Sequence, residues 1–255
     1  IILTLKILTK TNQINLLNIK KYNFKKNDLI FEKIINKKIE IFSNFNSLFK
    51  KKKFVFSAFN LAWIAFVFDK VDILKNHMVI WPDGIFAKLV LNREKISGRK
   101  LLRAFKFKRN IKNVYLIGKK DFFVLRYLKK KFYKSKIIMI DLPFAKIDEL
   151  IKIIDLKKKR FLSNSYFFIS LPTPKQEIIA SRILYSLKDS KIFCFGGALF
   201  DNSRSINPPN ILIEKYFEYL WRLRSDTFRR MLRLLISFIY FLKKMLTNQV
   251  NLNVK

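Results

Sequence analysis

The stretch Met78-Val79-Ile80-Trp81-Pro82-Asp83-Gly84 sets a short apolar run directly before an acidic residue and a glycine. Two later apolar runs also end at a candidate loop. Tyr166–Leu171 precedes the polar loop Pro172–Glu177, and Lys191–Phe195 precedes Gly196-Gly197. The chain has only five glycines in 255 residues, and glycine allows positive φ and close approach of the backbone to a ligand. The three loops are therefore the first places to look for a functional site.

Short β-type runs alternate with helix-like segments from residue 54 onward, at a spacing typical of parallel sheets. We predict an α/β fold, a Rossmann-like parallel sheet flanked by helices on both faces, followed by a C-terminal helical basic appendage. Ligands bind at the carboxyl ends of the strands in such sheets, so the three loops should share one edge. The predicted strands are Lys53–Ser57, Met78–Trp81, Asn113–Ile117, Lys136–Ile140, Tyr166–Leu171 and Lys191–Phe195. The predicted helices are Leu61–Leu74, Ile85–Leu91, Lys120–Lys131, Ala145–Leu156 and Pro174–Leu187.

The chain divides into four predicted segments. Residues 1–53 form a prelude rich in Lys, Asn and Ile, with a short strand or hairpin expected near Lys38–Phe42. Residues 54–210 form the α/β core, after which the strand pattern stops. Residues 211–247 form the helical appendage, and residues 248–255 form a tail.

The formal net charge of the chain is +35, and two explanations of it stand side by side. Lys, Asn, Ile and Phe are abundant while Gly and Pro are scarce, which is typical of AT-rich coding. The other explanation is an anionic partner, either a phosphate-bearing substrate or an anionic membrane surface. A nucleic-acid partner is disfavoured, because the lysines are spread along the whole chain and no nucleic-acid-binding motif is present.

Cysteine and histidine are too scarce for most metal and nucleophile chemistry. The single cysteine, Cys194, excludes an internal disulfide, fits a reducing compartment and lies in an apolar run, which predicts a buried structural thiol. His77 is the only histidine, which disfavours a typical zinc site and a histidine-based triad. No segment reaches the ~18–20 apolar residues that span a bilayer, and the first residues lack a signal-peptide pattern. We therefore expect a cytoplasmic protein without a metal cofactor.

Asp83 has two interpretations. A partly desolvated carboxylate at the mouth of a strand, followed by the flexible Gly84, suits a general base. The alternative is that Asp83 only caps the next helix. Taken alone, the residue favours the second interpretation.

The loop Pro172–Glu177 opens a predicted helix, whose free N–H groups and positive end favour anionic ligands. Glu177 would oppose a phosphate at this position, so we expect it to bind sugar or ribose hydroxyls or to stabilise the helix start. Gly196-Gly197 allows the backbone to approach a diphosphate.

The sequence predicts one or two helices over Ile211–Leu246 in the C-terminal region. On a continuous helix, Arg222, Arg229 and Arg233 return to nearly the same face. The apolar run Leu234–Leu242 follows and suits a membrane interface, with basic residues on anionic headgroups. The alternative is a terminal helix that packs on the domain with a solvated charged face.

Several short motifs occur in a fixed order: Asp83-Gly84, Glu94–Gly98, Pro174–Glu177, Gly196-Gly197 with Phe200-Asp201, and Glu218–Leu223. In this order the sequence resembles the WecG/TagA/CpsF glycosyltransferase family from about Phe54 to Arg233. The resemblance implies an inverting hexosyltransferase. Such an enzyme moves an N-acetylhexosamine-type or other hexose from a UDP-sugar to a polyprenyl-diphosphate-linked sugar, in cell-envelope polysaccharide or teichoic-acid-like polymer biosynthesis. It also implies a protein peripheral to the inner face of the cell membrane, and self-association into a homo-oligomer.

The resemblance also implies residue roles. Asp83 matches the catalytic base, and Arg222, Arg229 and Arg233 match arginines that hold the lipid diphosphate and the membrane. The positions that match or flank the substrate and nucleotide pocket are Ser57, Asn60, Gly84, Lys95, Gln176, Glu177, Gly196, Gly197 and Asp201. Arginines and backbone N–H groups can stabilise the leaving UDP without a metal, so no cofactor is expected beyond the UDP-sugar substrate.

The chain departs from the pattern of the family it resembles. Phe86 stands at the usual second glycine after Asp83-Gly84, Lys95 at a usual arginine, and Lys100 at a usual acidic residue. A second hypothesis is therefore a catalytically degenerate member that binds lipid-linked glycan or assembly partners without turnover. The retained Asp83, Asn60 and Gln176 favour the enzyme.

Overall fold

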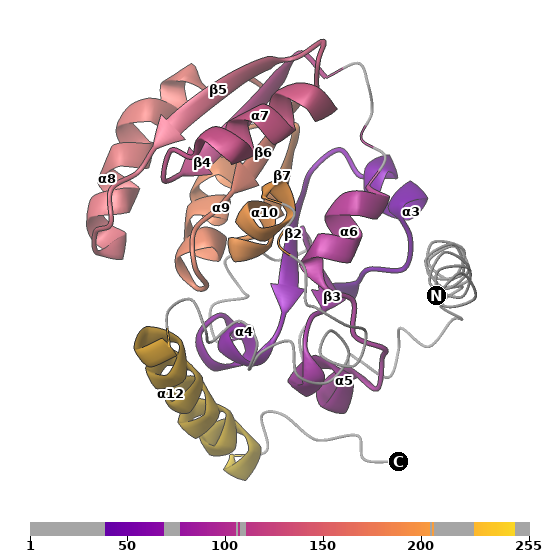
Figure 1. The fold of residues 1–255 in the computed structure, drawn as a ribbon, viewed down its shortest axis with the longest axis vertical. Helices are drawn as coiled ribbons and strands as arrows, with labels where there is room; N and C mark the ends of the chain where they lie inside the picture. The colour runs from indigo at the N-terminus through magenta and orange to yellow at the C-terminus, as the bar shows by residue number, and fades with distance from the viewer. Residues whose placement is uncertain are drawn as a thin grey trace, which may run out of the picture.

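The computed structural model describes residues 39–68, 77–105, 107, 111–204, 206 and 227–247. Within these ranges the strands are β1 (Glu40–Ile41), β2 (Phe54–Phe59), β3 (Met78–Pro82), β4 (Asn113–Gly118), β5 (Lys136–Asp141), β6 (Ser165–Ile169) and β7 (Ser190–Cys194). They form one seven-stranded sheet in the order β1-β3-β2-β7-β6-β4-β5, and every pairing is parallel (Figure 1). This confirms the predicted Rossmann-like α/β fold.

The six strands predicted from apolar runs are confirmed, each to within a residue or two of its expected ends. A parallel sheet covered on both faces needs side chains that are apolar in both directions, and every residue of β2, β3 and β6 is buried. The extended stretch expected near Lys38–Phe42 is confirmed as β1, which pairs with β3.

Helices cover both faces of the sheet. One face carries α4 (Leu61–Phe66), α5 (Ile85–Leu91), α8 (Ile147–Lys157), α9 (Lys175–Ser186) and α12 (Thr227–Leu246). The other face carries α3 (Phe45–Lys50), α6 (Gly98–Ala104), α7 (Phe122–Lys131) and α10 (Gly197–Ser203). A short 3-10 turn, η2 (Lys158–Arg160), follows α8.

The alternation of side chains along each strand separates the core into two apolar layers. In β2, Val55 and Phe59 join the layer under α4 and α9, while Phe54 and Phe56 join the layer under α6 and α10. Ser57 has the same parity as Val55, which turns its hydroxyl toward α9. A polar side chain in the middle of a buried strand is thus directed at one particular helix.

Three helices were not predicted. Two of them, α3 and α6, begin at side-chain caps: Asn44 Oδ1 accepts from Ser47 N–H at 2.8 Å, and Ser97 Oγ accepts from Lys100 N–H at 3.3 Å. The third, α10, begins at Gly196, which has no side chain to cap it. Each helix has seven residues or fewer, too short for a clear helical period in the sequence.

The C-terminal helix α12 confirms that the appendage is helical over 227–246, whereas Arg222 and the rest of 207–226 lie outside the described residues. Figure 1 places α12 next to α4, at the end of the molecule toward which the arrow of β2 points. Phe241 of α12 is buried in the core, and its ring lies 5.4 Å from that of Phe86. No helix in the described part of the chain is both long and apolar enough to cross a membrane.

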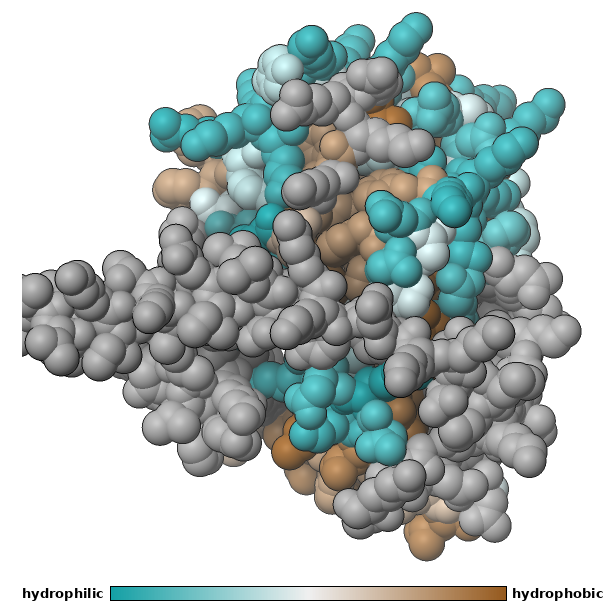
Figure 2. Space-filling view, turned by 90° about the vertical axis from the view of Figure 1, so that its right-hand side faces the viewer, coloured by the Kyte–Doolittle hydropathy of each residue, from teal (hydrophilic) through white to brown (hydrophobic). Residues whose placement is uncertain are grey.

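The polar surface is broad rather than confined to one element. Hydrophilic side chains occupy much of the described surface in Figure 2, with apolar side chains visible between and below them. Exposed lysines occur on elements far apart in the sheet order, among them Lys129 and Lys130 on α7 and Lys136 on β5.

Candidate active site

The carboxyl ends of the central strands β2, β6 and β7 bring Asn60 together with two of the three predicted site loops, Pro172–Glu177 and Gly196-Gly197. The chain leaves β2 and β6 toward α4 and α9 on one face, but leaves β7 toward α10 on the opposite face. Ligands of open α/β sheets bind at such a point, outside the carboxyl ends of the strands. The third predicted loop, with Asp83, follows β3, which neighbours β2.

Asn60 and Asp83 are the first residues beyond paired strand ends, because Phe59 is in register with Pro82. The backbone N–H of Asp83 donates to Phe59 O at 2.9 Å. Asn60 is the N-cap of α4, where its Oδ1 accepts from Trp63 N–H at 3.1 Å. The N-cap position of α5 belongs to Gly84, at φ 87°, and not to Asp83.

A buried polar cluster joins β2, the loop after β6 and the first turn of α9. The Oε1 atom of Glu177 accepts three hydrogen bonds, from Ser57 Oγ at 2.7 Å, Gln176 Nε2 at 2.8 Å and Thr173 Oγ1 at 3.2 Å. Gln176 Nε2 also donates to Thr173 Oγ1 at 3.1 Å. The sequence predicted Ser57, Gln176 and Glu177 as site residues, but not Thr173, whose position inside the singled-out loop was the available signal.

Two oxygens of this cluster face inward without a hydrogen-bond partner in the described residues: Gln176 Oε1 and Glu177 Oε2. The two side chains belong to residues that are 3% and 1% exposed. Burial raises the pKa of the Glu177 carboxyl, against the lowering effect of its hydrogen bonds from Ser57, Gln176 and Thr173. The cluster therefore favours a neutral carboxyl with unused hydrogen-bonding capacity.

Gly196 closes over this cluster from the end of β7. Its φ is +49°, and a Cβ there would lie 3.2 Å from Leu171 O and 3.4 Å from Gln176 Oε1. The next residue, Gly197, has no atom within 4 Å of such a Cβ. The two predicted glycines thus differ, since only Gly196 is required by backbone conformation and close packing.

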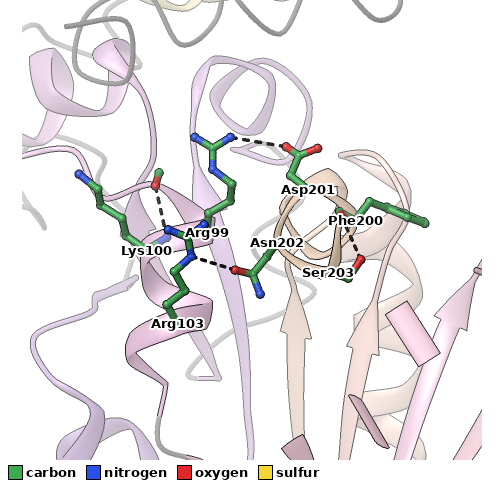
Figure 3. A network of polar contacts seen from close by, with 8 residues as sticks. Arg99, Lys100, Arg103, Phe200, Asp201, Asn202 and Ser203 are labelled. Carbon is green, nitrogen blue, oxygen red and sulfur yellow. Dashed lines mark hydrogen bonds and ion pairs between the residues drawn. The ribbon is translucent and has the colours of Figure 1, made fainter. Parts of the chain in front are cut away.

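On the other face, α6 meets α10 through polar pairs. Arg99 Nη1 lies 4.0 Å from Asp201 Oδ2, and Figure 3 shows the guanidinium directed toward that carboxylate. Arg103 Nε donates to Asn202 Oδ1 at 3.3 Å on the same pair of helices. The predicted site residue Asp201 is therefore paired with Arg99, a 1% exposed residue that the sequence did not single out.

One predicted arginine reaches the cluster. Arg233 of α12 donates from Nη2 to Thr173 O at 2.6 Å, so the appendage touches the loop that holds Glu177. Arg229 lies on α12 one turn earlier, and Arg222 is outside the described residues. Lys95 lies half-buried in the segment between α5 and α6.

The predicted buried thiol is confirmed. Cys194 is buried at the end of β7 and donates to Gln176 O at 3.7 Å, and burial, with the neighbouring Glu177 second, raises the pKa of its thiol well above the usual value. Partial burial and the nearby Lys53 lower the pKa of His77. Across the described ranges, no group of three or more His, Cys, Asp or Glu side chains is placed to hold a metal ion.

The fold is that of an α/β protein with an open parallel sheet, and the candidate site lies at the carboxyl edge of this sheet, where such folds bind ligands. The model of the glycosyl transferase WecG/TagA/CpsF family matches residues 45–254, and the chain belongs to this family. Sugar transfer is thus the reaction class that the family supports. No curated protein matches the chain closely enough to add a relative.

Proposed function

We propose that this protein is an inverting glycosyltransferase that uses a UDP-sugar donor and a polyprenyl-diphosphate-linked sugar acceptor in cell-envelope polymer biosynthesis. The transferred group is an N-acetylhexosamine-type or other hexose residue. Membership of the glycosyl transferase family supports the reaction class. The nature of donor and acceptor rests on the motif resemblance and on the chemistry of the site.

The single observation that carries the proposal is the pair of inward-facing oxygens on Gln176 and Glu177. A buried oxygen without a hydrogen-bond partner is costly, so a ligand that supplies a donor to the amide oxygen of Gln176 is favoured at this place. Sugar hydroxyls and an acetamido N–H are such donors. Gln176 Oε1 lies beside Gly196, where the backbone can approach a ligand closely.

In the proposed reaction Asp83 is the general base. It removes the proton from the acceptor hydroxyl while that oxygen attacks the anomeric carbon, and the bond from this carbon to the UDP oxygen breaks. Attack opposite to the leaving group inverts the anomeric configuration. The place of Asp83, directly beyond the end of β3 and beside Asn60, supports this role.

The leaving UDP gains negative charge, which cationic side chains and backbone N–H groups can stabilise. The proposal assigns this task to arginines of the appendage and to the Gly196-Gly197 backbone, with no metal cofactor. Arg233 is the described arginine that reaches the site loop, through Thr173 O.

The appendage is proposed to rest on the inner face of the cell membrane. Its helix exposes large apolar side chains, including Phe228, Leu235 and Ile239 at 79%, 57% and 56%. An amphipathic helix with apolar and basic residues suits the interface of an anionic bilayer. Lys243, exposed in its last turn, supplies part of the positive charge, whereas Lys244 is buried and lies over the ring of Phe68.

The test is release of UDP from a panel of UDP-sugars, with a short-chain prenyl-diphosphate sugar as acceptor. The proposal expects release that depends on the acceptor and persists in the presence of a chelator. Binding of the lipid-linked acceptor without turnover of any UDP-sugar in a complete panel would instead support the degenerate binder.

A further inference from the structure

Helices α6 and α10 meet near their first turns and enclose a buried arginine. The N–H of Ile96, just before α6, donates to Pro82 O at 2.7 Å, which ties the start of α6 to the end of β3. A Cβ built at Gly98 would lie 2.8 Å from the Cβ of Ala198, so the two helices approach to backbone distance. Arg99 follows Gly98, is 1% exposed and lies against α10. A buried cation thus stands where the segment after β3 meets the segment after β7.

Asp201 of α10 supplies the counter-charge that a buried guanidinium needs. Arg99 Nη1 lies 4.0 Å from Asp201 Oδ2, and the guanidinium is directed toward this carboxylate (Figure 3). Arginine keeps its charge at any ordinary pH, so the carboxylate faces a permanent positive charge. Replacement of a buried ion pair by apolar side chains is often neutral or stabilising. The stability of the fold alone therefore does not account for an arginine at this position.

Asp201 reaches the surface although its partner does not. Its side chain is 22% exposed, against 2% for the side chain of Arg99. Asp201 stands four residues after Gly197 in α10, so both positions share one face of the helix, and helical side chains lean toward the N-terminus. Apart from the backbone of its own helix, no atom of the described residues comes within 4 Å of a Cβ built at Gly197. The carboxylate therefore borders open space beside Gly197.

We propose that Arg99 is a positioning residue of the donor site, where it holds the Asp201 carboxylate so that this group accepts a hydrogen bond from a hydroxyl of the bound nucleotide sugar. The inference rests on the proposed function and adds a residue that itself touches no ligand. An ionised carboxylate accepts several hydrogen bonds at once, so pairing with Arg99 leaves Asp201 able to accept from a ligand. Ribose and the transferred hexose both carry such hydroxyls.

The test is a double-mutant cycle on the binding of UDP, UDP-glucose and UDP-N-acetylglucosamine to the full chain, measured by calorimetry. Asp201→Asn keeps an oxygen for Arg99 but loses the negative charge, and should weaken binding about tenfold, as expected for one hydrogen bond to a charged group. Arg99→Met keeps a long side chain without the charge and should weaken binding about threefold. In the Asp201→Asn background, Arg99→Met should change the affinity by less than about twofold.

The three probes distinguish the two sources of the hydroxyl. Weaker binding of all three probes to the variants assigns the hydroxyl to ribose, which every probe contains. Weaker binding of the two sugar-bearing probes, with binding of UDP unchanged, assigns it to the hexose. Either pattern supports the role of Arg99, provided that the effect disappears in the Asp201→Asn background.

Arg103→Met is the matched control, because Arg103 joins the same two helices through a 3.3 Å hydrogen bond to Asn202 Oδ1, at an exposed position (Figure 3). It should leave the affinity within about twofold of wild type, since additive effects are the rule for uncoupled residues. Arg99→Lys keeps the charge without the planar fork and should bind the probes more tightly than Arg99→Met. Circular dichroism shows whether each variant is folded. If Arg99→Met does not fold, Arg99→Lys completes the cycle with Asp201→Asn.

The inference is overturned if Arg99→Met lowers the free energy of unfolding but leaves all three affinities unchanged, because the arginine would then only join the helices. It is also overturned if Arg99→Met weakens binding equally with and without Asp201→Asn, or if wild type binds none of the probes. Failure of the proposed function gives a different result. Binding that follows the cycle without transfer from any UDP-sugar would remove the transferase and leave the role of Arg99 standing. Transfer with the same KM in wild type and Arg99→Met would do the reverse.

Discussion

Ser57 in β2 donates a 2.7 Å hydrogen bond to Glu177 in α9, although 120 residues separate them in the chain. Glu177 is 1% exposed, and the bond holds its side chain at the edge of the sheet where the parallel strands end. Ser57 is itself fully buried, and its hydroxyl would lose its partner if Glu177 were removed. The pair thus fixes the first turn of α9 against the central strand, which positions Gln176 and Thr173 as well.

Glu177→Gln should change how stability depends on pH. Burial raises the pKa of Glu177 from its ordinary value of 4.5, so the folded state holds the proton more tightly than the unfolded state. The contribution of this proton to the free energy of unfolding is fully present below about pH 4.5. It is lost as pH rises toward the raised pKa, with a slope of up to about 1.4 kcal/mol per pH unit. Glutamine does not titrate, so the variant should gain stability relative to wild type across this interval, as measured by urea unfolding at a series of pH values.

Glu149→Gln is the matched control, because Glu149 is an exposed glutamate in the first turn of α8. Its effect on the free energy of unfolding should be smaller, and should not show the same rise with pH relative to wild type. Parallel pH profiles for wild type and Glu177→Gln would mean that the carboxyl of Glu177 titrates normally.

The sequence predicted the strands well because a parallel sheet buried on both faces leaves short, continuous apolar runs. The predicted strands Met78–Trp81 and Asn113–Ile117 illustrate this, since each ends within one residue of its strand in the structure. Helices α6 and α10 lacked such a signal, because both are short: α6 begins at a Ser97 cap, and the two helices pack against each other.

The site was predictable where a residue lies next to a strand end. Asp83 and Gly196 follow β3 and the last strand closely, so the pattern of apolar runs and loops was enough to find them. Thr173 lies four residues before its partner Glu177, in the loop that the sequence singled out, whereas Arg99 acquires its role from Asp201 on another helix. Spacing along one chain does not carry that information without the three-dimensional arrangement.

Gly196→Ala should destabilise the protein and weaken nucleotide-sugar binding. A side chain at φ +49° is strained, and its Cβ would press on Leu171 O and on Gln176 Oε1. The expected loss is about 1–3 kcal/mol of unfolding free energy, measured by urea denaturation, with a raised KM for the UDP-sugar. Gly197→Ala is the natural comparison, because open space surrounds the added methyl group; a larger effect there than at Gly196 would contradict this account.

Cys194 should resist thiol reagents in the native protein. It is buried, and its thiol pKa is raised well above the usual value, so the reactive thiolate is scarce and inaccessible. An aromatic disulfide reagent should react at the rate at which the protein opens, and rapidly once denaturant is added. The chain has a single cysteine, so the signal belongs to this residue. Rapid stoichiometric reaction under native conditions is the result that would refute burial.

Arg233→Ala should loosen α12 from the site loop. The guanidinium donates to Thr173 O at 2.6 Å, and loss of a partly exposed charge-assisted bond should cost about 1 kcal/mol. Amide hydrogen exchange in α12 should therefore be faster than in wild type, and KM for the lipid-linked acceptor higher. Lys243→Ala removes an exposed positive charge from the last turn of the same helix and should leave exchange near the middle of α12 unchanged. Equal exchange in all three proteins would show that Arg233 does not hold the helix.

Asp83→Asn should lower the turnover number by about a hundredfold or more, because a general base contributes roughly 10²–10⁴-fold. The amide keeps the size of the carboxylate but cannot accept the acceptor proton, so UDP binding should stay close to that of wild type. Asp141→Asn is a control at the same edge of the sheet, at the end of β5, where the carboxylate accepts from Lys120 N–H at 2.8 Å. The decisive measurement is acceptor-dependent UDP release beside calorimetric UDP binding for the three proteins. If Asp83→Asn turns over as fast as wild type, another group takes the proton and the base must be sought elsewhere along this edge.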